Sequence, residues 1–153
     1  MTNATESWAQ ASRMEHAILD HIKQALRVTL DWKAPSVGMA RKLSSVQFTM
    51  KSFQRHLQRV MDLEEAEGSL RTLAEKRPHL DDAIRRLQRE HVAIRAELAE
   101  IVPRLDAVSA ADGPAVEEAC AALARLLDRV DRHDGEEIRL LQEALLSDLG
   151  GEG

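Results

Sequence analysis

The chain has 153 residues, of which 44% are hydrophobic and only 3% aromatic, with no Tyr. This length suits one domain with its own hydrophobic core, and the lack of alternating β-branched runs argues against a sheet, so we expect an all-α fold. The 26 acidic and 21 basic residues are interspersed and give a net charge of −5, which argues against a nucleic-acid-binding surface.

The sequence also bears on membrane association and on the redox state of the protein's compartment. No segment approaches the roughly 20 consecutive apolar residues of a membrane span, and the N-terminus lacks a basic patch followed by an apolar run. The single cysteine, Cys120, cannot form an internal disulfide, and its place near an apolar stripe predicts a small core residue in a reducing compartment. We therefore expect a cytoplasmic protein, monomer or dimer, with neither nucleic acid nor membrane as a partner.

The first half of the chain predicts two long helices, because apolar residues recur three or four positions apart in both. The first spans about residues 6–32, with Thr5 or Ser7 as its N-cap. A segment containing Pro, Ser and Gly ends this helix. The second helix spans about residues 39–67, with Gly68 as its C-terminal signal.

The second half predicts two more helices. A short loop containing Pro78 leads to the third, at about residues 80–107, and we expect Pro103 to kink or shorten its end. A loop containing Gly and Pro precedes the fourth, at about residues 114–149, and residues 150–153 are expected to form a flexible tail.

Four helices with short connections predict a single domain over residues 1–153, folded as an up-down-up-down antiparallel four-helix bundle. Metal sites in such bundles are built from side chains that point inward from facing helices. Ionisable residues on the apolar stripes are therefore the candidates for function.

Four ionisable residues stand where the stripes of three helices should carry Leu or Ile, namely Glu64, His91, His133 and Glu137. His91 replaces an aliphatic residue in the middle of the third stripe, and Glu64 continues the second stripe beyond Val60. His133 and Glu137 lie one turn apart on the inward face of the fourth helix, a spacing that can chelate a cation.

A buried carboxylate needs a cation, an arginine or a proton as its partner, because an unpaired charge in a low dielectric costs several kcal/mol. Arg95 and Arg125 are candidate arginine partners, and a hydrogen-bonded network of the two Glu and two His residues is the alternative without metal. Imidazole and carboxylate together suit iron, manganese or zinc, and two carboxylates able to bridge favour a dinuclear site.

Several short motifs follow one another along nearly the whole chain. They are Glu15-His16, Asp62-Leu-Glu-Glu65 followed by Glu67-Gly68, Arg89-Glu-His91, His133-Asp-Gly-Glu-Glu-Ile-Arg-Leu-Leu-Gln-Glu-Ala144 and Ser147-Asp-Leu-Gly150. In the order and loop positions of these motifs the chain resembles the bacterial hemerythrin-like (HHE cation-binding) domains. Those domains are four-helix bundles that hold a non-haem di-iron centre.

The resemblance implies a set of metal ligands. Glu64 and Glu137 would bridge the two irons, His91 and His133 would be terminal ligands of one iron, and His16 would be a terminal ligand of the other. Two positions depart from the family pattern. Val60 stands one turn before Glu64, where family members usually carry His, and Arg95 stands where the oxygen-carrying members have a second His. One iron site therefore lacks a ligand, and Arg95 is placed to pair with a bridging carboxylate.

The first-helix ligand has alternatives, because Glu15 lies nearer the middle of the first stripe while His16 and His21 flank it. His56 is rotated away from the second-helix carboxylate and cannot replace the missing ligand without a helix distortion, so we expect it at the surface or at a boundary. We expect His79, in a loop, to be exposed to solvent.

By this resemblance the protein would bind dioxygen, nitric oxide or peroxide at non-haem iron, or sense or store iron. The alternative is a degenerate bundle with one metal or none that acts as a structural or signalling module, which Val60 and Arg95 favour. Oxidase- or peroxidase-like turnover is a third reading, without an identifiable proton donor. Gly-rich phosphate loops, nucleophile elbows and Cys-x-x-Cys pairs are absent from the sequence, so we do not expect an enzyme.

Overall fold

The computed structural model describes residues 3–32, 38–66 and 70–150, with the backbone alone described at 3–9, 70–71 and 145–150. The elements are helices α1 (Asn3–Leu30), α2 (Gly38–Glu65), α3 (Leu70–Lys76), α4 (Asp81–Ala107) and α5 (Gly113–Gly150), with a 3₁₀ turn, η1 (Pro78–Leu80), before α4. Within these ranges there is no strand, which confirms the predicted all-α class.

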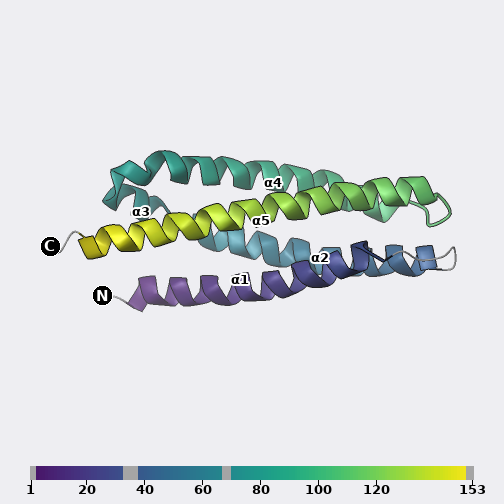
Figure 1. Ribbon diagram of the computed structural model, residues 1–153, viewed down its shortest axis with the longest axis horizontal. Coiled ribbons are helices and arrows are strands. Elements are labelled where there is room, and N and C mark those ends of the chain that lie inside the picture. The colour runs from purple at the N-terminus through teal and green to yellow at the C-terminus, as the bar shows by residue number, and fades with distance from the viewer. Residues whose placement is uncertain (1–2, 33–37, 67–69, 151–153) are drawn as a thin grey trace.

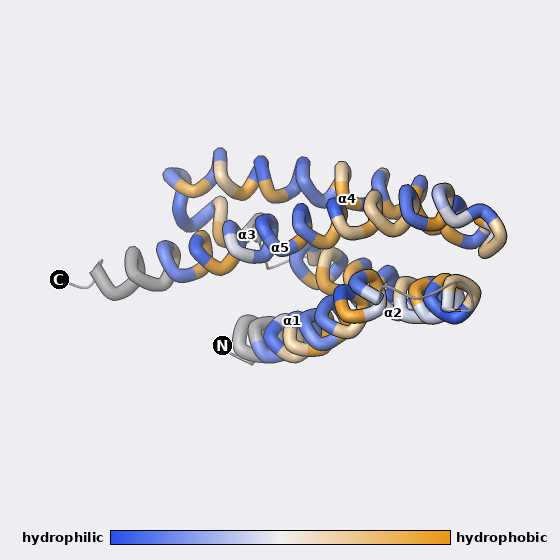
Figure 2. The backbone as a smooth tube through the Cα atoms, turned by 45° about the vertical axis from the view of Figure 1, so that its right-hand side comes forward, coloured by the Kyte–Doolittle hydropathy of each residue, from blue (hydrophilic) through white to orange (hydrophobic). Residues whose placement is uncertain are grey.

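The four long helices lie side by side along the long axis of the molecule (Figure 1). The last residues of α1 and the first residues of α2 lie at the same end of the molecule as the connection from α4 to α5, and the first residues of α1 and the last residues of α5 lie at the other end. Helix α1 packs mainly on α2 and α4 mainly on α5, while α2 also contacts α4. Hydrophobic and hydrophilic residues alternate with the helical turn along each long helix, so each has one apolar face to bury (Figure 2).

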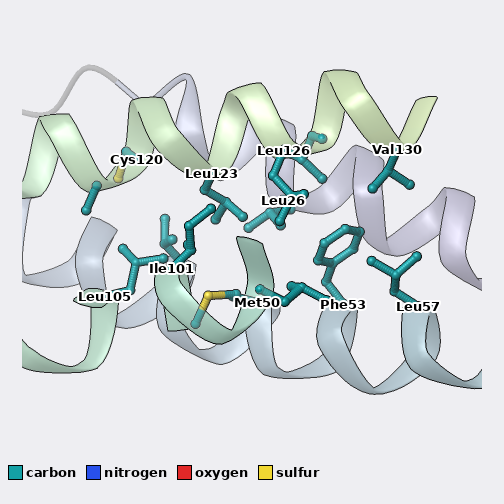
Figure 3. Close-up of a cluster of buried hydrophobic side chains, with 14 of the residues drawn as sticks. Leu26, Met50, Phe53, Leu57, Ile101, Leu105, Cys120, Leu123, Leu126 and Val130 are labelled. Carbon is teal, nitrogen blue, oxygen red and sulfur yellow. The ribbon is translucent and has the colours of Figure 1, made fainter. Parts of the chain in front are cut away.

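The larger core cluster lies towards the end of the molecule where α4 connects to α5, and Figure 3 shows part of it. All four long helices contribute to it, and Phe53, Met50 and Leu26 are fully buried there. Cys120 is a buried free cysteine in the same cluster, which confirms its prediction as a small core residue.

A smaller core cluster lies towards the chain termini. It joins Leu80, Ile84 and Leu87, from η1 and α4, to Leu140 and Ala144 of α5. Along α4 and α5 the two clusters are separated by a stretch in which the buried positions are ionisable instead of aliphatic. The helical stripes thus place a polar cluster inside an otherwise apolar interior.

The start of the first helix differs from the prediction. Helix α1 begins at Asn3, so Thr5 and Ser7 lie inside it instead of capping it, because the surrounding helix-forming residues let the helix extend past them. At its other end α1 stops at Leu30, whose carbonyl oxygen accepts a hydrogen bond from Lys42 Nζ at 2.9 Å. This bond satisfies one of the carbonyls that a helix end leaves without a partner.

The segment before α4, predicted as a loop, contains the short helix α3, because Leu73 and Ala74 pack on the smaller core cluster. Pro103 does not shorten α4, which continues to Ala107 and buries Leu105 completely. The expected C-terminal signal at Gly68 and residues 151–153 of the predicted tail lie outside the described residues, whereas Gly150 is the last residue of α5. Among the helices that are described, none has the length and apolar character needed to cross a membrane.

Candidate metal centre

Four ionisable side chains from three helices meet in the interior. Glu64 comes from α2, His91 from α4, and His133 and Glu137 from α5, and one ligand atom from each lies within 4.8 Å of all the others. All four residues are buried, with exposed fractions of 0 to 3%. Their positions on the apolar stripes predicted this inward placement.

A fifth candidate, His16, approaches the cluster from α1. Its Nε2 atom lies 3.2 Å from Oε1 of Glu64 and 3.3 Å from Oε1 of Glu137. The His16 side chain is 24% exposed, in contrast to the buried residues that it contacts. The cluster therefore has one wall that is accessible from solvent.

The other histidines and the first-helix alternative lie away from the cluster. Glu15 pairs with His56, whose Nδ1 atom lies 3.2 Å from Oε2 of Glu15 and whose side chain is 15% exposed. His21 and His79 are exposed. Of the three first-helix candidates, His16 is the one that faces Glu64 and Glu137, and the boundary position of His56 and the exposure of His79 are as predicted.

The two carboxylates of the cluster face in two directions. Their Oε1 atoms face His16, and their Oε2 atoms face the imidazoles of α4 and α5. Oε2 of Glu64 lies 2.7 Å from His91 Nε2, and Oε2 of Glu137 lies 3.6 Å from His133 Nε2. Neighbouring ligands of an octahedral cation at about 2.1 Å lie roughly 3.0 Å apart, so these separations fit donors around a small cation.

The two buried imidazoles are oriented from behind by carboxylates. Nδ1 of His91 lies 3.0 Å from Oε1 of Glu65, and Nδ1 of His133 lies 3.0 Å from Oε2 of Glu90. A carboxylate accepts a hydrogen bond here only from a protonated Nδ1, which leaves Nε2 to face the cluster. The two Nε2 atoms are 3.0 Å apart, a spacing at which two lone pairs need a proton or a cation between them.

The sequence pattern did not predict that Glu65 and Glu90 contact the two imidazoles. Glu65 directly follows Glu64 and Glu90 directly precedes His91, so each is offset by one residue from a buried stripe. At about 100° per residue this offset places a side chain at the edge of the buried face, where a carboxylate can reach inward while staying partly hydrated. The one signal in the sequence was that each acidic residue directly neighbours a candidate metal ligand.

Both predicted arginine partners of the buried carboxylates are wrong. Arg95 pairs with Glu65 and with Asp62, at the surface, and not with Glu64 or Glu137. Arg125 lines an open groove of about 590 Å³ between α4 and α5. The buried carboxylates face imidazoles instead, since His16, His91 and His133 surround them.

Proton affinities in the cluster follow from this packing. Burial lowers the pKa of His16, but hydrogen bonds to Glu137 and Glu64 outweigh it and raise the pKa to about 10. Burial likewise opposes the charged form of His133, and hydrogen bonds to Glu64 and Glu90 raise its pKa to about 9. Without metal, the cluster therefore balances its carboxylate charge with imidazolium protons.

The two carboxylates respond differently to the same surroundings. Burial raises the pKa of Glu64, but hydrogen bonds from the three surrounding imidazoles outweigh it and hold that pKa well below its usual range. Burial and the neighbouring charge of Glu64 raise the pKa of Glu137 to about 7, although His16 opposes the rise. Glu137 is thus the carboxylate that is costly to ionise in the absence of a cation.

The donor set fits a metal ion on a further observation. Oε2 of Glu137 is buried and has no hydrogen-bond partner among the described residues. A buried oxygen acceptor without a partner is destabilising, and a cation between the carboxylates and imidazoles would satisfy it. Val60, one turn before Glu64, is 2% exposed and packs in the larger core cluster without a donor atom.

A buried ion pair beside the cluster was also missed. Lys23 is 5% exposed, and its Nζ atom donates to Oδ2 of Asp134 at 2.9 Å. The signal was present, because Lys23 stands between Leu19 and Leu26 on the buried stripe of α1. The pair joins α1 to α5, and the charge of Asp134 contributes to the raised pKa of His16.

Comparisons with protein-family models, with curated proteins and with solved structures find no match to this chain. What the fold and the site define is a class: an all-helical protein with a buried group of two histidines and two glutamates that can hold a metal ion.

Proposed function

We propose that this protein is a hemerythrin-like metal-binding protein with a non-haem di-iron centre, which binds dioxygen, nitric oxide or peroxide or serves to sense or store iron. The fold would be an up-down-up-down antiparallel four-helix bundle. The four long helices lie side by side, and α1 ends and α2 begins at the same end of the molecule as the connection from α4 to α5, which supports this topology (Figure 1). The centre lies between the two apolar clusters, which would keep bulk water away from bound metal.

One observation carries the proposal, namely the two-sided arrangement of Glu64 and Glu137. Each carboxylate presents Oε1 to His16, while Oε2 of Glu64 faces His91 and Oε2 of Glu137 faces His133. Carboxylates placed in this way can bridge two cations. His91 and His133 would then complete one metal site, and His16 would complete the other.

The ligand count leaves room for a small exogenous ligand. The side of the centre at His91 and His133 has four protein donors, and the side at His16 has three, because Val60 supplies none. When bound, iron supplies a Lewis-acidic, redox-active position to which a diatomic molecule or peroxide can bind. The partial exposure of His16 offers such a molecule a route from solvent.

A mononuclear centre is the second candidate, and the compactness of the buried group favours it. Glu64, His91, His133 and Glu137 each offer one atom within a single span of 4.8 Å, without His16. In that case one cation would be held by α2, α4 and α5, and His16 would remain a protonated neighbour of the carboxylates.

The test is the metal content and visible spectrum of protein purified from iron-supplemented culture. We expect about two irons per chain and an oxo-to-iron charge-transfer band, whereas about one iron would support the mononuclear centre. Glu137→Gln should lower the iron content, while the matched control Glu143→Gln, at an exposed position of the same helix, should not. Metal-free protein whose thermal stability is unchanged by anaerobic Fe²⁺ would contradict the proposal, because ligand binding stabilises the native state by mass action.

A further inference from the structure

Arg95 makes a two-pronged contact across the interface between α4 and α2. Its Nη1 atom lies 2.6 Å from Oε1 of Glu65, and its Nη2 atom donates to Oε2 of the same carboxylate at 2.8 Å and to Oδ1 of Asp62 at 3.0 Å. A guanidinium fork on a carboxylate fixes the orientation of both groups, which a single point charge would not do.

The carboxylate that Arg95 holds is the one behind His91. Oε1 of Glu65 lies 3.0 Å from His91 Nδ1, so this oxygen is shared between the guanidinium and the imidazole. His91 itself is fully buried, whereas Glu65 and Arg95 are about one-third exposed. A continuous line of contacts therefore runs from the surface, through Glu65, to a side chain of the candidate metal centre.

We propose that Arg95 is a positioning residue for the metal centre, which acts through Glu65 to fix the tautomer and ring orientation of His91. This inference rests on the proposed metal-binding function. With Nδ1 of His91 donating to a fixed carboxylate, Nε2 is held with its lone pair towards Glu64 and His133. His133, whose imidazole faces that of His91, is oriented by Glu90 in the same way.

A purely structural role for Arg95 predicts a different pattern of effects. Exposed ion pairs contribute little to folding stability. Loss of the Arg95 ion pairs alone would therefore lower the free energy of unfolding slightly, and the metal affinity would fall by a similarly small amount. A positioning role predicts a loss of metal affinity far larger than the loss of stability, because a metal ligand must present its lone pair in one direction. The coordination environment of the bound metal should also change.

The experiment uses Co²⁺ as the probe, bound to the full chain, with its affinity measured by titration and its coordination read from the visible absorption of the bound ion. Arg95→Gln and Glu65→Gln should each weaken Co²⁺ binding by about tenfold and alter the absorption bands. Arg95→Lys keeps the charge but not the fork and should restore part of the affinity. Arg104→Gln is the matched control, since Arg104 is 39% exposed and pairs across α4 and α5 with Glu118, and it should bind Co²⁺ as the unmodified chain does.

Two results overturn the inference. One is unchanged Co²⁺ affinity and spectrum in both Arg95→Gln and Glu65→Gln, and the other is an equal loss in Arg95→Gln and in the Arg104→Gln control. If Arg95→Gln does not fold, the comparison of Arg95→Lys with the unmodified chain decides in the same way. Failure of the unmodified chain to bind Co²⁺ or Fe²⁺ would instead contradict the proposed function itself.

Discussion

Replacing Glu137 by Gln should make the metal-free protein more stable while weakening its capacity to bind metal. Packing raises the pKa of Glu137 from its ordinary 4.5 to about 7. An acid that holds its proton more tightly in the folded than in the unfolded protein makes stability fall as the pH rises between these two values. At about 1.4 kcal/mol for each pH unit, the ionised carboxylate costs the folded protein about 3 kcal/mol at pH 8.

Gln removes that cost, because it fills nearly the same volume without ionising. For a chain of this size, about 3 kcal/mol corresponds to a rise of roughly 6 to 12 °C in the midpoint of thermal unfolding. The measurement is calorimetric unfolding in a chelator at pH 8, repeated at lower pH, where the difference should shrink towards zero near pH 4.5. Glu143→Gln, at an exposed position of the same helix, is the control and should leave the midpoint unchanged.

The opposite outcome would refute the reasoning. If the metal-free Glu137→Gln protein is less stable than the unmodified chain at pH 8, the carboxylate stabilises the fold by itself. Glu64, His91, His133 and Glu137 would then form a hydrogen-bonded structural network, which is the alternative without metal.

Three further outcomes are expected. Val60→His should lower the thermal unfolding midpoint of the metal-free protein, because overpacking at this buried position costs about 1 to 3 kcal/mol. The same substitution should raise the iron content, and an unchanged iron content would contradict a ligand position there. Gly135→Ala should stabilise the protein by about 0.5 to 1 kcal/mol in denaturant unfolding without changing metal affinity, since a Cβ there meets nothing within 4 Å. Metal affinity, measured by calorimetry, should fall as the pH is lowered from 9. The reason is that a bound cation displaces protons from His16 and His133, whose pKa values are raised to about 10 and about 9. An affinity that does not change with pH would contradict this expectation.

The buried group was accessible to sequence reasoning because helical periodicity fixes which residues share a face. Glu64, His91, His133 and Glu137 each continue a long aliphatic series, and a residue in such a series is carried into the core wherever its helix packs. That inference needs no knowledge of which helices are neighbours. Periodicity therefore predicted that these four residues are buried, and in a bundle with one core it also predicted that the three helices bring them together.

The first helix shows where the same reasoning reaches its limit. Ile18 is apolar yet 40% exposed, whereas the charged Lys23 is buried with its Nζ atom on Asp134. The rotation of α1 about its axis depends on partners in other helices, among them the carboxylate of Asp134, which periodicity does not identify. The choice of His16 over Glu15 as the residue facing the cluster required that rotation.

The residues that orient the imidazoles depend on tertiary pairing in the same way. Glu65 and Glu90 have the local surroundings of surface acids, and their contacts with His91 and His133 arise only when α2, α4 and α5 are brought together. The short helix α3 is likewise decided by packing on the smaller core cluster and not by a strong local signal.

Anomalous X-ray diffraction at the iron edge, from crystals grown with Fe²⁺ under anaerobic conditions, tests the dinuclear centre most directly. We expect two anomalous peaks between Glu64 and Glu137, one bound by His91 and His133 and the other by His16. A single peak bound by the four buried residues would establish a mononuclear centre. The absence of any peak among these side chains, in crystals that contain iron elsewhere or none at all, would contradict a metal centre in this protein.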